Sequence, residues 1–291
     1  MNLIAGATGM LGSEICRLLR EKGKPVRALV RSSSNPETLA RLRSTGADVV
    51  QGDLKDPASL EVACRGVKSV ISTASSMHSR QGGDSIDSVD RQGQLNLIEA
   101  AENAGAEQFI LVSFPAIDIS FPLQSAKRAV EDRLQRSRMI YTILQPTCFM
   151  EVWLGPALGF DPAHGTARIY GAGHNKMSWI SFQDVAQFAV AALNNERAAR
   201  AVIKLGGPDA LSPLEVVRLA EQLTGKTITV QHVPEDALRA QHGAATDPLQ
   251  QTFAALMLYY ARGDVIDAKD ALRVLPVQRL KSAREYLPAI A

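Results

Sequence analysis

The stretch Gly6-Ala7-Thr8-Gly9-Met10-Leu11-Gly12 decides the fold of this 291-residue chain. It follows the apolar run Asn2–Ala5 and opens a helical pattern that ends at Gly23. Glycines at such a strand–turn–helix junction let the backbone bend sharply and approach a pyrophosphate, and the helix N-terminus supplies free N–H groups. The spacing is GxxGxxG rather than GxGxxG, and the alternative is a simple tight turn. Its place after a buried strand and before a helix predicts a dinucleotide-binding site.

Strand-like and helical patterns alternate through the first half of the chain. The strand-like runs are short and rich in Val, Ile and Leu, as expected for strands buried on both faces of a parallel sheet. They are Asn2–Ala5, Val26–Val30, Asp48–Gln51, Ser69–Thr73, Gln108–Ser113 and Met139–Leu144. The helical patterns between them are Gly9–Lys22, a helix capped at Asp56-Pro57, Asp87–Ala104 and Ser125–Arg136. This alternation predicts an α/β protein with a Rossmann-type doubly wound parallel sheet.

The pattern changes after about residue 145, where Gly and Pro crowd a loop-rich stretch. Two helices with serine caps follow, opening at Ser181 and Ser212, and Ala201–Leu205 between them is a candidate further strand. The tail from Pro234 reads as mostly helical. We therefore expect a nucleotide-binding domain over residues 1–150, with its sheet completed by about 175–205. A smaller, interleaved, mostly helical substrate-binding part should occupy 151–291.

The end of the second predicted strand bears on the choice of cofactor. Proteins that bind NAD usually place an acidic residue about 20 residues after the glycine turn, where it accepts hydrogen bonds from the ribose. Here Arg31 stands 19 residues after Gly12, followed by Ser32, Ser33 and Ser34. A guanidinium and hydroxyls suit a 2′-phosphate, so NADP(H) is predicted over NAD(H). The alternative is a solvated arginine at a strand end.

Two further loops fall at the carboxyl ends of predicted strands, where ligands of such folds bind. In Gly52-Asp53-Leu54 a carboxylate could accept a bond from the adenine amine, or Asp53 could instead cap the next turn. The small residues of Thr73-Ala74-Ser75 would let the cofactor ribose and nicotinamide pass closely.

Together these features resemble the short-chain dehydrogenase/reductase superfamily, specifically its atypical NmrA-like branch. The resemblance covers residues 1 to about 225 and rests on Gly6–Gly12, Arg31, Gly52–Leu54, Ser125–Glu131, Tyr141–Pro146 and Gly206-Gly207-Pro208. Members include NADPH-dependent quinone, triphenylmethane-dye and isoflavone-type reductases, and also cofactor-binding regulators with little or no activity. The predicted cofactor contacts are Gly6, Thr8, Gly9, Met10, Leu11, Gly12, Arg31, Asp53, Leu54, Thr73, Ala74, Ser75, Ser113, Lys127, Pro146 and Phe149.

The resemblance also identifies Lys127 as the candidate catalytic residue. Most of the superfamily pairs a Tyr, the general acid, with a Lys four residues later, but Leu123 stands at that position here. Ser113 is only a loose match to the superfamily's catalytic Ser. The departure disfavours ordinary alcohol dehydrogenation and sugar-nucleotide epimerisation, and agrees with the atypical branch. The alternative for Lys127 is a solvated lysine on an amphipathic helix.

The predicted substrate pocket is apolar and is represented by Phe114, Trp153 and Trp179, although core packing is the alternative for such side chains. The expected function is hydride transfer from NADPH to a flat, apolar acceptor such as a quinone or conjugated carbonyl. The alternative is a non-catalytic NADP(H)-binding redox sensor.

Composition excludes several other classes of protein. The 32 Lys and Arg residues against 30 Asp and Glu give a net charge of +2, which disfavours nucleic acid as a partner. Cys16, Cys64 and Cys148 form no CxxC pair, and the five histidines show no ligand spacing, so no metal site is expected. No apolar stretch reaches the 18 residues of a membrane span. A small-molecule partner and a reducing, cytoplasmic location are expected.

Overall fold

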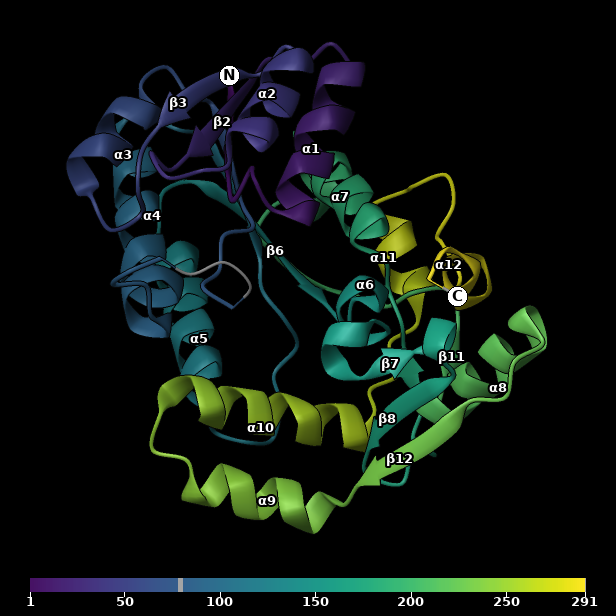
Figure 1. Cartoon of the computed structure of the whole chain (residues 1–291). Coiled ribbons are helices and arrows are strands. Elements are labelled where there is room, and N and C mark those ends of the chain that lie inside the picture. Colours follow the sequence, from purple (N-terminus) through teal and green to yellow (C-terminus); the bar gives the residue numbers. More distant parts are fainter. Residues whose placement is uncertain (78–80, 291) are drawn as a thin grey trace.

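A seven-stranded parallel sheet organises the computed structural model, which describes residues 1–77 and 81–290. Its order is β10-β6-β5-β4-β1-β2-β3 (Figure 1). The strands are β1 (Asn2–Ala5), β2 (Val26–Val30), β3 (Asp48–Gln51), β4 (Ser69–Ser72), β5 (Gln108–Val112), β6 (Ile140–Pro146) and β10 (Ala201–Leu205). The strand order reverses between β1 and β4, which opens a crevice at their carboxyl ends. The predicted Rossmann-type sheet is confirmed.

Helices cover both faces of this sheet and bury two apolar cores against it. On one face lie α1 (Met10–Glu21), α2 (Pro36–Ser44), α7 (Phe182–Ala191) and α11 (Ala268–Val274). On the other lie α3 (Pro57–Cys64), the π-helix η1 (Ile86–Gly93), α4 (Gln94–Asn103) and α5 (Pro122–Gln135). Proline at the first helical position fixes φ for α2, α3 and α5. The sheet is therefore buried on both faces, as its continuous apolar strands require.

The C-terminal part carries two small sheets and a helical layer. One sheet joins β7 (Phe160–Asp161), β8 (Thr166–Tyr170) and β12 (Thr229–Val233), and the other joins β9 (Met177–Ser178) and β11 (Ala210–Leu211). The helices are α6 (Met150–Trp153), α8 (Pro213–Thr224), α9 (Glu235–Ala244), α10 (Pro248–Arg262) and α12 (Ala283–Tyr286). Short 3₁₀ turns are η2 (Pro156–Leu158), η3 (Pro162–His164), η4 (Glu196–Ala198) and η5 (Leu287–Ala289). In Figure 1, α9 and α10 lie side by side below α5, and α10 contacts both.

The sequence expectations need correction at several elements. The predicted helix Asp87–Ala104 is divided into η1 and α4, because the chain takes a π-helical path until Gly93, where a Cβ atom would lie 2.8 Å from Leu54 Cβ. The strand predicted over Met139–Leu144 runs instead from Ile140 to Pro146, and two other strands end one residue early. The sheet of β7, β8 and β12 was missed, because half-exposed β12 lacks an apolar run.

Candidate functional site

The glycine turn between β1 and α1 has the backbone geometry of a phosphate cradle. Gly6 takes φ of +82°, and a Cβ atom there would lie 2.6 Å from Thr73 Oγ1. A Cβ atom on Gly12 would lie 2.1 Å from the Gly6 carbonyl oxygen, so positions 6 and 12 accept only glycine. Gly9 caps α1 without a side-chain hydrogen bond, and a Cβ atom on it would contact only the Gly6 oxygen, at 3.4 Å. The open side of Gly9 and the N-terminal amides of α1 fit a pyrophosphate.

The tip of this turn faces outward, as a binding loop must. Thr8 and Gly9 are exposed, and Met10 keeps 49% of its surface accessible. Leu11 turns the other way and packs against the core under α1. The residues available to a ligand are therefore consecutive at the tip of the turn, and buried or half-buried residues support the turn on either side.

The loop after β4 lies directly beside the glycine turn. The backbone N–H and the hydroxyl of Thr73 both donate to the Ala5 carbonyl, at 3.0 and 3.1 Å. Gln94 on α4 holds the same loop, since its amide donates to the Ala74 carbonyl at 2.9 Å and its oxygen accepts from Ser72 Oγ at 2.8 Å. Thr73, Ala74 and Ser75 are half-buried there. The structure thus brings two of the predicted cofactor segments together.

Arg31, at the end of β2, is held in an ion cluster rather than solvated. Its Nη1 donates to Asp84 Oδ2 at 2.6 Å, and Lys55 Nζ donates to Asp84 Oδ1 at 2.5 Å. The Asp84 side chain is only 1% exposed. Burial acts to raise the pKa of Asp84, but bonds from Lys55, the Gln81 amide and Arg31 outweigh it and hold that pKa below its ordinary value. Sequence reasoning missed Lys55, although it follows Asp53 by two residues at a strand end.

Asp53 performs the capping role that sequence left open. Its Oδ1 accepts from the Lys55 amide at 2.8 Å, while its Oδ2 lies 4.0 Å from Lys55 Nζ. Leu54 is buried, and its carbonyl accepts from Asn96 on α4. The turn after β3 is therefore anchored at the same edge of the sheet as Arg31.

Lys127 lies inside the protein, which excludes the solvated alternative. Its side chain is 7% exposed, and Nζ lies 3.7 Å from Oδ1 of Asp90, a carboxylate that is 0% exposed. The other oxygen of Asp90 accepts from the amide and the hydroxyl of Ser76, at 3.0 and 2.6 Å. Among the described residues, Asp90 Oδ1 has no hydrogen-bond partner. Asp90 belongs to η1, and such π-helical turns frequently occur at functional sites.

Ser113 and Phe114 are organised by Arg128, which sequence reasoning also missed despite its place next to Lys127. Arg128 Nη2 donates to Ser113 Oγ at 3.0 Å and to the Phe114 carbonyl at 2.6 Å. The same guanidinium pairs with Glu131 at 2.9 Å, and its burial lowers the pKa of Arg128. Its guanidinium also lies over the Phe114 ring, 5.5 Å from the centroid.

Leu123 is buried in an apolar cluster with Phe121 and Ala126, so no phenol stands four residues before the lysine. Phe114 is half-buried and stacks on Phe121, with ring centroids 5.9 Å apart.

The other predicted apolar residues lie at different depths. Trp153 is half-buried and stacks on Tyr260 at 5.2 Å, whereas Trp179 is fully buried and donates to the Leu211 carbonyl at 2.9 Å. Pro146 ends β6 and is buried, and Phe149 is half-buried in a bridge to Ile180. Phe114, Trp153 and Phe149 thus keep surface that a ligand could contact.

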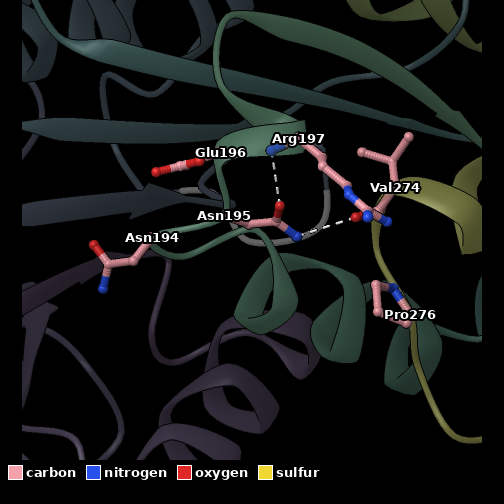
Figure 2. Close-up of a pocket in the computed structure, with 6 residues that line it drawn as sticks. All are labelled: Asn194, Asn195, Glu196, Arg197, Val274 and Pro276. Atoms are coloured by element: carbon pink, nitrogen blue, oxygen red, sulfur yellow. Dashed lines mark hydrogen bonds between the residues drawn. The ribbon is translucent and has the colours of Figure 1, made fainter.

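Two of the surface hollows formed by the described residues lie away from the glycine turn. The first, of about 500 Å³, is lined by Asn194, Asn195, Glu196, Arg197, Val274 and Pro276 (Figure 2). Its loop precedes β10, and Asn195 bridges the Arg197 amide and the Val274 carbonyl. It therefore lies at the amino ends of the strands, opposite the glycine turn. The second, of about 420 Å³, lies between η1, α5 and the start of α10.

Other kinds of site have no support in the described ranges. The structure there holds no group of three or more His, Cys, Asp or Glu suited to a metal ion. Cys16, Cys64 and Cys148 are buried and unbridged, and burial raises the pKa of the Cys16 thiol to about 12. No helix in the same ranges has the length and apolar character needed to cross a bilayer.

Comparison with known proteins identifies the family. The model of the NmrA-like family matches residues 2–285. The chain is 32% identical to photosystem II assembly factor Ycf39 of Synechocystis sp., over 81% of this chain and 72% of that protein. It is 31% identical to an NAD(P)H azoreductase of Xenophilus azovorans, over 78% and 75% of the two chains.

A solved structure extends the similarity to the whole fold. NADPH-dependent quinone oxidoreductase QOR2 of Escherichia coli, complexed with NADPH, has a TM-score of 0.78 and 25% identity, with 99% of both chains covered. The resemblance inferred from the glycine turn and the Lys127 helix is confirmed, as is the NAD(P)-binding Rossmann fold. This chain belongs to the NmrA-like family.

Proposed function

We propose that this protein is an NADPH-dependent reductase that transfers hydride to a flat, apolar acceptor such as a quinone or conjugated carbonyl. The observation that carries the proposal is the buried Lys127 ammonium beside Asp90, joined through Ser76 to the loop next to the glycine turn. A lysine kept from solvent at the carboxyl edge of the sheet suits a role in holding or giving a proton. The named activities of the azoreductase and quinone oxidoreductase relatives support a reductase.

The residues present fit NADP(H). The uncapped start of α1 and the open side of Gly9 would hold the pyrophosphate, and Arg31 with Lys55 would hold the 2′-phosphate. Thr73, Ala74 and Ser75 would lie along the ribose and nicotinamide. The bound cofactor supplies the hydride, and the protein supplies binding, orientation and a dry site.

Lys127 would orient the acceptor oxygen through its ammonium and supply the proton at Nζ. Leu123 offers no hydroxyl in its place, so the lysine or water must complete the proton transfer. Half-buried Phe114 and Trp153 would pack against the flat faces of the acceptor and exclude water. Arg128 keeps Phe114 and Ser113 in position.

A binding role without turnover is the second candidate, and the similarity to an assembly factor favours it. In that role the protein would report the NADP redox state to a partner protein. For either role we propose a cytoplasmic location, because three buried, unbridged cysteines suit a reducing compartment. The net charge of +2 supports a small-molecule partner over nucleic acid.

One assay separates the two roles. Purified protein is titrated with NADPH and then offered a panel of quinones, azo dyes and conjugated carbonyls while NADPH oxidation is followed. Turnover of any acceptor supports the reductase. If the protein binds NADPH tightly but oxidises it with no acceptor of the panel, the reductase proposal is wrong and the sensor role is supported.

A further inference from the structure

Asp84 places a carboxylate on the two cations that would receive the 2′-phosphate. We propose that Asp84 is an internal competitor for that phosphate and thereby sets the discrimination between NADPH and NADH. The inference rests on the proposed cofactor binding, and it concerns a residue that belongs to neither the glycine turn nor the proton-handling group.

Asp84 forms ion pairs with both Arg31 and Lys55. One oxygen accepts from Arg31 at 2.6 Å and the other from Lys55 at 2.5 Å, so the carboxylate bridges the ends of β2 and β3. Its side chain is almost wholly shielded, while Arg31 and Lys55 each keep about a quarter of their side-chain surface exposed. A ligand can therefore reach the cations, and would meet the carboxylate already bonded to them.

A 2′-phosphate and a carboxylate compete for the same donors. Both are oxygen anions that accept charge-assisted hydrogen bonds from guanidinium and ammonium groups, and the two anions repel each other when brought close. NADPH therefore binds at the cost of displacing or crowding Asp84. NADH brings a neutral 2′-hydroxyl, which can donate to a carboxylate, so the same residue does not oppose it.

The turn that carries Asp84 can release the carboxylate without disturbing the core. Asp84 closes a turn whose first residue is Gln81, with N–H to Gln81 O at 3.0 Å and Oδ2 accepting from the Gln81 amide at 2.9 Å. Added Cβ atoms would meet nothing within 4 Å at Gly82, and only Lys55 Nζ, at 3.9 Å, at Gly83. Among the described contacts, the ion pairs of Asp84 with Arg31 and Lys55 join this turn to the sheet, and Ser88 Oγ of η1 donates to its Gly83 carbonyl at 3.0 Å.

Direct titration of both cofactors tests the proposal. Dissociation constants for NADPH and NADH are measured by calorimetry on wild type, Asp84→Asn and Asp87→Asn. Asparagine keeps the size of the side chain and an oxygen for the Gln81 amide, but removes the charge. Asp87→Asn removes the same charge three residues away, from a side chain that is 75% exposed.

Asp84→Asn should bind NADPH about tenfold more tightly than wild type, because one like charge has been removed from the phosphate seat. Its affinity for NADH should not increase, so the NADPH-to-NADH preference should rise about tenfold as well. Asp87→Asn should match wild type for both cofactors. Binding of 2′,5′-ADP should follow NADPH, since it carries the 2′-phosphate without the nicotinamide.

Failure of this inference can be told apart from failure of the proposed function. If wild type binds NADPH and Asp84→Asn binds it no more tightly, Asp84 is not a competitor and only this inference falls. If neither protein binds either cofactor, both proposals fall. NADPH binding that appears only in Asp84→Asn would support the competitor role. Asp84→Ser provides a second neutral variant, and if circular dichroism shows both variants unfolded, Asp84 is a structural ion-pair residue and the inference is wrong.

Discussion

Asp90 Oδ1 lies 3.7 Å from Lys127 Nζ, with both side chains shielded from solvent. The pair joins η1 to α5, while the second oxygen of Asp90 is fixed by two bonds from Ser76 in the loop after β4. The carboxylate is therefore oriented independently of the lysine. The loop that borders the glycine turn therefore fixes the orientation of the carboxylate that Lys127 faces.

Breaking this pair should destabilise the protein from either side. Asp90→Asn leaves a buried ammonium without its counter-charge, and Lys127→Met leaves a buried carboxylate without its cation. Each should lower the free energy of unfolding by about 3 kcal/mol. The double variant should lose at least about 1 kcal/mol less than the sum of the two. Urea unfolding of all four proteins measures this coupling, and strict additivity would show that the pair contributes nothing.

Lys127→Ala should separate proton handling from cofactor binding. Loss of a positioned acid costs about 10²–10⁴-fold in rate, so kcat on a carbonyl acceptor should fall in that range. The loss of kcat should be smaller with a quinone as acceptor, because its reduced product can take a proton from water. The dissociation constant for NADPH should change far less than kcat, since the glycine turn and Arg31 supply most contacts. Equal losses on the two acceptors would count against the proton role.

Two glycines of the same turn should respond in different ways to substitution. Gly9→Val should fold normally, because a Cβ atom there meets only one atom, at 3.4 Å, yet it should abolish NADPH binding by filling the pyrophosphate seat. Gly12→Ala should instead lower stability, because its Cβ atom would overlap the Gly6 carbonyl. Thermal unfolding and NADPH titration of both variants check the distinction. Normal NADPH binding by Gly9→Val would show that the pyrophosphate does not bind at Gly9.

Arg31→Ala should reduce the preference for NADPH. Loss of one charge-assisted bond at about 1.5–3 kcal/mol corresponds to a loss of roughly tenfold to two-hundredfold in NADPH affinity. NADH affinity should be little affected. Lys55→Ala should also reduce the preference for NADPH, because Lys55 pairs with the same carboxylate as Arg31 and would contact the same phosphate. Fluorescence titration with both cofactors gives the ratio of the NADH and NADPH dissociation constants. If this ratio is unchanged in both variants, the 2′-phosphate does not bind at Arg31 and Lys55.

Asp184 should make the protein less stable as the pH rises from about 4 to 6. Burial, with the nearby Glu151 carboxylate, raises the pKa of Asp184 to about 6 against a bond from the Lys281 amide. Its unfolded pKa is about 3.9, so the native state binds more protons in this window and the free energy of unfolding falls with rising pH. The fall attributable to this group reaches about 3 kcal/mol above pH 6.

Asp184→Asn is the variant that isolates this contribution. It keeps an oxygen for the Lys281 amide and has no proton to lose, so its unfolding free energy should vary less between pH 4 and 7.5. Urea unfolding at several pH values gives both curves. Parallel curves for wild type and variant would assign the pH dependence to other groups.

Local patterns in the sequence predict most of the sheet and the glycine turn. Asn2–Ala5 and Val26–Val30 match the structure residue for residue, because strands buried inside a parallel sheet are mostly apolar along their length. Ala201–Leu205 also matches, although it lies at the edge of the sheet and exposes Val202 and Lys204. The turn is local in part: a Cβ atom on Gly12 would overlap Gly6 within the turn, whereas one on Gly6 would overlap Thr73, which only the folded sheet brings beside it. The candidate role of Lys127 came from the family resemblance rather than from its helix, which carries many charges.

The ion clusters around the site could not be predicted in the same way. Asp84 lies 53 residues from Arg31 and 29 from Lys55, and only the folded sheet brings the three together. Asp90 falls in a stretch that has the periodicity of an ordinary α-helix, but the chain is π-helical there and Asp90 lies 3.7 Å from Lys127 Nζ. Pairings across such separations depend on tertiary packing, which no single pattern in the chain specifies.

The packing of α7 on α1, and of β10 on β6, determines when the nascent chain can complete its N-terminal half. Both covering elements belong to residues 182–205, so the first 146 residues leave the ribosome with β6 as an open edge and without α7 against α1. Unpaired strand edges and bare apolar faces are the surfaces on which nascent chains aggregate. Translation must therefore reach Leu205 before the N-terminal half can close, and a protein cut at residue 150 would be an aggregation-prone fragment rather than a smaller nucleotide-binding domain.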